Sequence, residues 1–153
     1  MVGIRETRIL PYSAEQMFDL VADVKNYGKF LPWVVATRIR SDSETEMVAD
    51  MVVGFKSLRE SFTSKVFKDR AKRIEVLYLD GPLSDLDNVW TFKVIDANNC
   101  EVGFSVDFQF KNKVFQALAG QYFDRAFRKM VAAFEQRAFE LYGSNNSNAQ
   151  SVA

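Results

Sequence analysis

The sequence contains no histidine, which narrows the chemistry that its side chains can do. This absence excludes serine–histidine and cysteine–histidine nucleophilic pairs, histidine-bound metals and the commonest general base. Carboxylate catalysis remains, and Glu60 with Tyr78 is the pair that could converge inside a folded domain. A cross-strand ion pair of Glu60 with Arg59 or a nearby lysine is the more ordinary interpretation. An enzyme is therefore the least expected class of function.

A second candidate for chemistry is the segment 27–33, with the sequence Tyr-Gly-Lys-Phe-Leu-Pro-Trp. Gly28 loosens the backbone and Pro32 removes an amide donor, so the segment is expected to form a turn between two elements. Loops usually run over the surface and are polar, whereas this one is aromatic. It therefore either plugs one end of the core or lines a binding site or membrane contact, and the sequence leaves both interpretations open.

The balance of positive and negative charge limits the classes of partner that this protein is expected to bind. Basic and acidic residues number 20 each, whereas nucleic-acid binding needs a concentrated basic surface. DNA is therefore not expected as a partner. Residues 111–142 nevertheless hold six basic and three acidic side chains. This stretch suits either an anionic membrane surface or an ordinary solvated helix face.

The only cysteine, Cys100, excludes an internal disulfide and is compatible with a reducing compartment. We expect it to pack as a small apolar residue at the start of a strand. The first ten residues are too charged for a signal peptide, and no apolar run is long enough to span a membrane. We therefore expect a cytoplasmic protein that could contact the inner face of the cell membrane peripherally.

Hydrophobic periodicity predicts the order of the elements, beginning with a strand over residues 2–10 at a sheet edge. Ser13 and Gln16 form a capping-box pattern, which starts a short helix to about residue 22. Asp23 then starts a second short helix that ends near Phe30.

Alternating apolar residues predict about six strands between residues 33 and 110, joined by turns as in an antiparallel meander. The alternation is clearest over 102–110, where Phe104, Val106 and Phe108 should face the helix layer. Apolar residues at threes and fours over 113–142 predict one long helix that Gly143 ends. We expect a single domain of residues 1–143 and a disordered polar tail of residues 144–153.

These elements, with the residues at their joints, resemble the coenzyme Q-binding branch of the START-like (polyketide cyclase/dehydrase, helix-grip) family, as a bacterial member. The resemblance covers residues 2–143 and is carried by residues 13–24, 27, 30–33, 53–55, 60–64, 80–83, 86, 88–90, 92, 134–138 and 141–143. Val34 departs from it, because many relatives have a cysteine there. The resemblance implies an α+β fold in which a curved antiparallel sheet of about seven strands wraps around the long C-terminal helix, with two short helices after the first strand.

The resemblance also implies a ligand-binding protein rather than an enzyme, with no cofactor and no metal. Its ligand would be ubiquinone or a polyprenyl precursor, held between sheet and helix, and its role would be quinone delivery in respiration or quinone biosynthesis at a membrane. The alternative is a toxin that blocks association of ribosomal subunits, as described for bacterial relatives. Oligomeric state stays open.

The residues expected to bind the lipid are apolar side chains from the loop, the strands and the helix. They are Phe30, Leu31, Pro32, Trp33, Val53, Phe55, Leu58, Phe62, Leu83, Leu86, Trp90, Phe104, Phe108, Phe115, Phe123, Phe127 and Met130. Glu60 could hydrogen-bond a quinone head group if it points inward. The turn 80–83 could act as a flexible gate over the cavity.

Overall fold

The computed structural model describes residues 2–55 and 58–152, excluding the side chains of Phe55 and of residues 144–152. The elements are β1 (Val2–Leu10), α1 (Ala14–Ala22), the 3-10 helix η1 (Val24–Lys29), β2 (Val34–Asp42), β3 (Glu46–Phe55), β4 (Leu58–Asp69), β5 (Arg73–Asp80), β6 (Leu83–Asp96), β7 (Asn99–Phe110) and α2 (Lys113–Val152).

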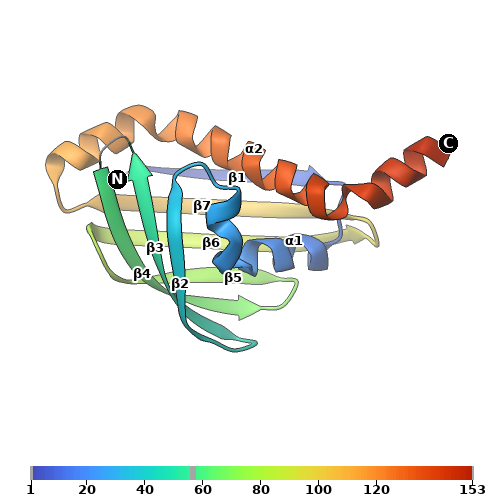
Figure 1. Ribbon diagram of the computed structural model, residues 1–153, viewed down its shortest axis with the longest axis horizontal. Helices are drawn as coiled ribbons and strands as arrows, with labels where there is room; N and C mark the ends of the chain where they lie inside the picture. The colour runs from blue at the N-terminus through green and yellow to red at the C-terminus, as the bar shows by residue number, and fades with distance from the viewer. Residues whose placement is uncertain (1, 56–57, 153) are drawn as a thin grey trace.

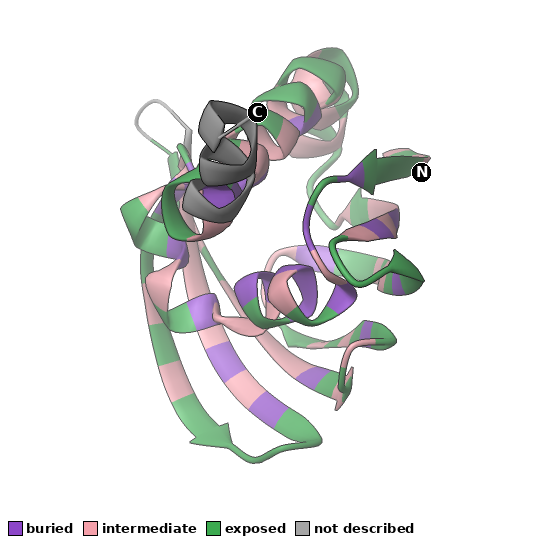
Figure 2. Cartoon of the chain, turned by 90° about the vertical axis from the view of Figure 1, so that its right-hand side faces the viewer, coloured by how far each residue is buried: buried purple, intermediate pink, exposed green. Residues whose placement is uncertain are grey.

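The strands form one seven-stranded antiparallel sheet in the order β1-β7-β6-β5-β4-β3-β2. The sheet is strongly twisted and curved, and α2 lies across its concave side over β1 and β7 (Figure 1). α1 sits within the same concavity, as the view along the sheet shows (Figure 2). This is the helix-grip architecture expected from the sequence, with the first strand at an edge.

α1 begins where the sequence predicts. The Ser13 hydroxyl accepts a hydrogen bond from the Gln16 amide, and the Gln16 side chain accepts one from the Ser13 amide, both at 3.0 Å. The helix buries Met17, Phe18, Leu20 and Val21. η1 starts after Asp23, but the Asp23 carboxylate accepts from the Asn26 side chain at 2.6 Å and does not cap the helix.

The predicted end of the long helix at Gly143 is wrong, because α2 continues to Val152. Gly143 is buried, and a Cβ there would lie 2.6 Å from the ring of Phe139. Close packing therefore explains the glycine, which is tolerated inside a helix at about 1 kcal/mol. The division into a domain of residues 1–143 and a tail of residues 144–153 stays a prediction.

The core lies between α1, the second half of α2 and one end of the concave face. Cys100 is fully buried within it, and burial raises the pKa of its thiol from 9.0 to about 11. The expectation that this cysteine packs as a small apolar residue is confirmed. The convex face is uncovered by any described helix, and Leu77 and Leu79 on it are each 49% exposed.

Candidate ligand-binding site

Alternate side chains of β7 point toward α2 along its length. The ring centroids of Phe104 and Phe127 lie 5.4 Å apart, and those of Phe108 and Phe123 lie 5.2 Å apart. Farther along, Phe110 contacts a ring in the first turn of α2, Phe115, at 6.0 Å. The prediction that Phe104 and Phe108 face the helix is confirmed. At about 3.3 Å per residue, the row from Phe104 to Phe110 spans roughly 20 Å.

One end of this sheet–helix interface is solid core. Phe134 of α2 is 6% exposed, and its ring meets those of Tyr27, Phe30 and Trp90 edge-on at 5.6, 5.3 and 5.4 Å. Phe127, which precedes Phe134 on α2, is 5% exposed. These rings fill most of the space between sheet and helix, so this end mainly supplies stability and leaves only a small cavity beside Trp90 and Phe127.

The other end carries large apolar side chains that are only half-buried. The strand registers place Met51 opposite Phe62 and Leu86 opposite Phe108, on the concave face. We call this region the open half of the concave face, and it consists of Met51, Val53, Phe62, Leu86, Phe108, Phe110, Phe115 and Phe123. Partly exposed aromatic and aliphatic groups in such number on one face are typical of a surface that binds a partner or ligand.

The predicted binding residues divide into groups in the structure. Six belong to the open half of the concave face: Val53, Phe62, Leu86, Phe108, Phe115 and Phe123. Four line a small cavity beside it: Trp90, Phe104, Phe127 and Met130. Two are buried in the core: Leu31 and Leu83. Phe30 and Trp33 are half-buried, Pro32 and Leu58 are exposed, and the side chain of Phe55 lies outside the described residues.

The small cavity has a volume of about 50 Å³ and lies between α1, β1, β6, β7 and α2. Its apolar wall consists of Leu10, Met17, Val21, Trp90, Val102, Phe104, Phe127, Met130, Val131 and Phe134. Drug-sized ligands occupy pockets of about 300–1,000 Å³, so a quinone ring could enter only if these side chains or α2 moved.

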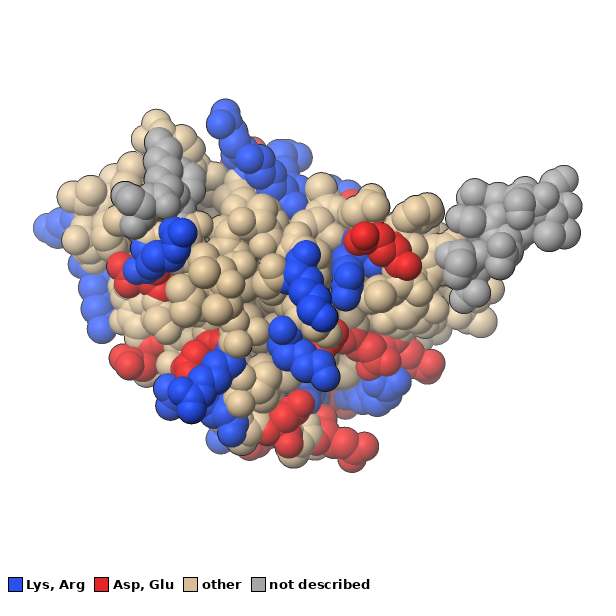
Figure 3. Space-filling model, in the orientation of Figure 1, with Lys and Arg blue, Asp and Glu red and all other residues tan. Residues whose placement is uncertain are grey.

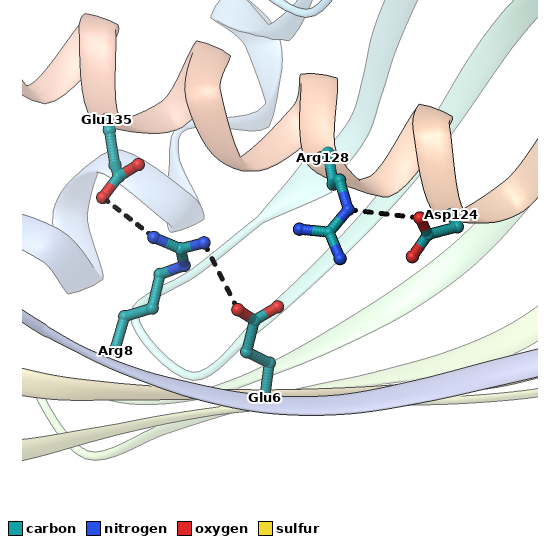
Figure 4. A network of polar contacts seen from close by, with 5 residues as sticks. All are labelled: Glu6, Arg8, Asp124, Arg128 and Glu135. Carbon is teal, nitrogen blue, oxygen red and sulfur yellow. Dashed lines mark hydrogen bonds and ion pairs between the residues drawn. The ribbon is translucent and has the colours of Figure 1, made fainter.

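Three charged residues complete the lining, and sequence reasoning missed them. They are Glu6 and Arg8 on β1 and Glu135 on α2. Arg8 lies 3.3 Å from a Glu6 oxygen and 3.6 Å from a Glu135 oxygen (Figure 4). The sequence contained a pattern that could have identified two of them, because period-2 alternation puts Glu6 and Arg8 on the same face of the strand as Leu10.

The aromatic segment 27–33, which begins within η1, is in part a core plug, and its role in ligand or membrane contact stays a prediction. Leu31 and Tyr27 are buried in the core, and the Tyr27 hydroxyl donates a hydrogen bond to the Val21 carbonyl. Burial raises the pKa of Tyr27 above its usual value. Phe30 packs under the guanidinium of Arg137 at 5.4 Å, which favours a cation–π contact. This half of the segment is a core plug, whereas Pro32 remains on the surface.

The turn 80–83 is held at both ends. Gly81 has φ +144°, the Leu83 amide donates to the Tyr78 hydroxyl at 2.9 Å, and the Lys111 amide donates to the Pro82 carbonyl at 2.9 Å. The Tyr78 hydroxyl therefore has a structural role in this turn. Glu60 is half-buried and lies opposite Val53 in the register. The gate and the head-group role of Glu60 stay predictions.

Within residues 2–55 and 58–152, no three carboxylate or thiol side chains gather closely enough to suggest a metal site. Nor does any helix in this part of the chain combine the length and apolarity that crossing a membrane requires.

Together, the helix-grip architecture and its apolar concave face define a START-like protein. Residues 10–135 match the family described as polyketide cyclase / dehydrase and lipid transport, and the chain belongs to that family. The resemblance predicted from the sequence is confirmed.

The relatives include bacterial toxins and a coenzyme Q-binding protein. The ribosome association toxin RatA of Pseudomonas aeruginosa is 37% identical over 140 residues, which cover 92% of this chain and 97% of the toxin. The RatA protein of Rickettsia prowazekii is 34% identical and covers 92% and 99%. A mitochondrial coenzyme Q-binding protein of Xenopus laevis is also 34% identical, over 90% of this chain but 58% of its own length. None of these three is named as an enzyme.

Solved structures support the same fold. The solution structure of an 18 kDa protein from Caulobacter crescentus has a TM-score of 0.74 at 37% identity, covering 94% of this chain and 99% of that one. The crystal structure of a Streptomyces aromatase/cyclase has a TM-score of 0.78 at 16% identity, covering 90% and 93%. At that identity the second likeness concerns the fold alone.

Proposed function

We propose that this protein binds ubiquinone or a polyprenyl precursor along its concave face and supports quinone delivery in respiration or quinone biosynthesis. It acts as a carrier rather than as an enzyme. The observation that carries the proposal is the open half of the concave face, where large apolar side chains of the sheet and of the first half of α2 are only half-buried. The coenzyme Q-binding relative supports the choice of ligand class.

A flexible isoprenoid chain fits this surface physically. The row of rings from Phe104 to Phe110 offers a path of roughly 20 Å between sheet and helix. Each Å² of apolar surface that a chain covers contributes about 25 cal/mol, so a lipid tail gains affinity without specific polar contacts. Met51 and Met130 suit such a ligand, because unbranched thioether side chains adapt to irregular shapes.

The direct test is to purify the protein without detergent, extract it with organic solvent and identify bound isoprenoids by mass spectrometry. A Phe108→Asp variant places a charge on the binding face, and Leu77→Asp places the same charge on the convex face as the matched control. We expect quinone or a polyprenyl precursor in the wild type and in Leu77→Asp, and little in Phe108→Asp. If no isoprenoid co-purifies with the wild type or exchanges into it from vesicles, the proposal is wrong.

Delivery requires contact with a membrane, for which α2 offers a surface. Arg125, Arg128 and Lys129 are exposed on it, and Lys and Arg side chains project over this helix in Figure 3. Each cation near an anionic bilayer adds about 1 kcal/mol, although Arg128 is already paired with Asp124 at 3.1 Å. Binding to vesicles with anionic lipids should therefore weaken in Arg125→Glu with Lys129→Glu, and binding unchanged by these substitutions would exclude α2 as the contact.

A second candidate function is inhibition of ribosomal subunit association, which the names of the RatA relatives favour. The same basic face of α2 would then meet ribosomal RNA, and binding would fall steeply with salt. Co-sedimentation with purified ribosomal subunits over a salt series tests this function. Absence of co-sedimentation at low salt would remove it, independently of the lipid extraction.

A further inference from the structure

We infer that Arg8 is the polar anchor for the ligand, and that it donates hydrogen bonds to a carbonyl of a neutral, quinone-like head group. Glu6 and Glu135 hold the guanidinium in place. The inference rests on the proposed function and adds the head-group chemistry that the site selects.

The first argument is the position of Arg8. The register places Arg8 opposite Val102 and Glu6 opposite Phe104, so both point to the concave side of the edge strand. Figure 4 shows their side chains rising from β1 toward α2, where Glu135 reaches down. The apolar cavity wall is mostly buried, whereas the side chains of these three residues are between 32% and 42% exposed. The charged group therefore lies at the mouth of the apolar cavity.

The second argument is the donor capacity of the guanidinium. Arginine has five N–H donors in a rigid fork. Its Nη2 lies 3.3 Å from Glu6 and its Nη1 lies 3.6 Å from Glu135, both longer than the 2.7–2.9 Å of a close charged hydrogen bond. Among the described residues, the Arg8 guanidinium makes these two ion pairs and no side-chain hydrogen bond. The two carboxylates thus position the fork while N–H groups remain for a ligand.

The third argument is the sign of the charge. Two carboxylates face one guanidinium at this mouth, and the neighbouring pair of Asp124 and Arg128 adds no net charge. The local excess is negative, so a carboxylate or phosphate head group meets repulsion there. A quinone offers carbonyl acceptors without charge, and an apolar ring that matches the wall formed by Trp90 and Phe104.

Three ring compounds with the same chain separate these effects: decylubiquinone, decylbenzene and 4-decylbenzoate. Arg8→Met keeps the length of the side chain but removes every donor. We expect Arg8→Met to raise the Kd of decylubiquinone about tenfold or more, because the ligand loses hydrogen bonds from a charged donor. The Kd of decylbenzene, which accepts no such hydrogen bond, should change less than about twofold. Arg8→Lys should recover part of the quinone affinity. Arg5→Met is the matched control, because Arg5 is on the opposite face of the same strand with its side chain 81% exposed.

The double variant Glu6→Gln with Glu135→Gln tests the charge argument. It should bind 4-decylbenzoate about tenfold more tightly than the wild type does, while decylbenzene is unaffected. Equal weakening of decylubiquinone and decylbenzene by Arg8→Met would show that the ion pairs only tie α2 to β1, and would overturn the inference. So would an unchanged Kd for decylubiquinone. If the wild type binds none of the three compounds, the proposed function itself fails.

Discussion

The two halves of the sheet–helix interface should respond differently to loss of a phenyl ring. Phe134 lies in the closed half, 6% exposed and in contact with three rings. Phe108 lies in the open half, half-buried, with ring neighbours Phe110 and Phe123 at 5.9 and 5.2 Å. We compare Phe134→Ala and Phe108→Ala, with Leu77→Ala on the convex face as the control.

The magnitudes follow from burial. Removing a buried phenylalanine costs about 3–5 kcal/mol, and a chain of this size loses about 2–4 °C in Tm per kcal/mol, so Phe134→Ala should lower the Tm by about 10 °C. Fully burying a phenyl side chain is worth about 1.5–3 kcal/mol. A ligand that covers the exposed half of Phe108 gains about 1 kcal/mol, so Phe108→Ala should raise the Kd about fivefold.

The assay pairs thermal unfolding of the ligand-free protein with equilibrium titration of decylubiquinone for each variant. Phe108→Ala should show a small Tm change with a clear rise in Kd, and Leu77→Ala should change neither. If Phe108→Ala lowers the Tm as much as Phe134→Ala does and leaves the Kd unchanged, the open half is merely loosely packed core. The assignment of the ligand to this face would then be refuted.

Three further outcomes are expected. Ser13→Ala, which breaks the capping box with Gln16, should lower the free energy of unfolding in urea by about 1 kcal/mol, and an unchanged value would show that the cap is not stabilising. Gly81→Ala should lower the free energy of unfolding by about 1–3 kcal/mol in the same assay, because φ is +144° and a Cβ would lie 2.8 Å from a β4 carbonyl oxygen. Gly28→Ala is the control, because a Cβ there meets nothing closer than 3.8 Å. Cys100 should resist alkylation at neutral pH until the protein unfolds. Because its pKa rises from 9.0 to about 11 on folding, its contribution to stability is complete below pH 9 and is lost as the pH rises toward 11; a Cys100→Ala variant with the same pH slope as the wild type would contradict this.

Local patterns were enough to predict most of the elements. The capping box at Ser13 and the alternation over 102–110 depend on neighbours in sequence, so α1 and β7 could be located directly. Gly143 led to a wrong prediction of the helix end, because its role depends on side-chain packing rather than on a pattern of residue types. Its role is a contact with the ring of Phe139, which a rule for helix ends does not consider.

The candidate site was predictable only in part. Apolar periodicity predicted that Phe108 faces the helix layer and that Phe123 lies on the apolar stripe of the helix, because period-2 and helical alternation fix which face a side chain takes. Their ring contact is a finding of the structure. The same alternation could not separate them from Phe134, since a buried ring and a ligand-lining ring have the same sequence pattern. The charged mouth was missed because its members come from the edge strand and from the far end of the chain.

The sequence by itself determined that this chain has an apolar core, belongs to the α+β class and cannot use histidine for catalysis or metal binding. These properties follow from composition and periodicity, which depend only on residue types and their spacing. Only the tertiary structure decided which end of the interface closes and which stays half-open. That outcome depends on the twist of the sheet and on the line that α2 takes over β1 and β7 (Figure 1). The tertiary structure also placed Arg8 against Glu135, although the other six strands lie between these two residues in the sequence.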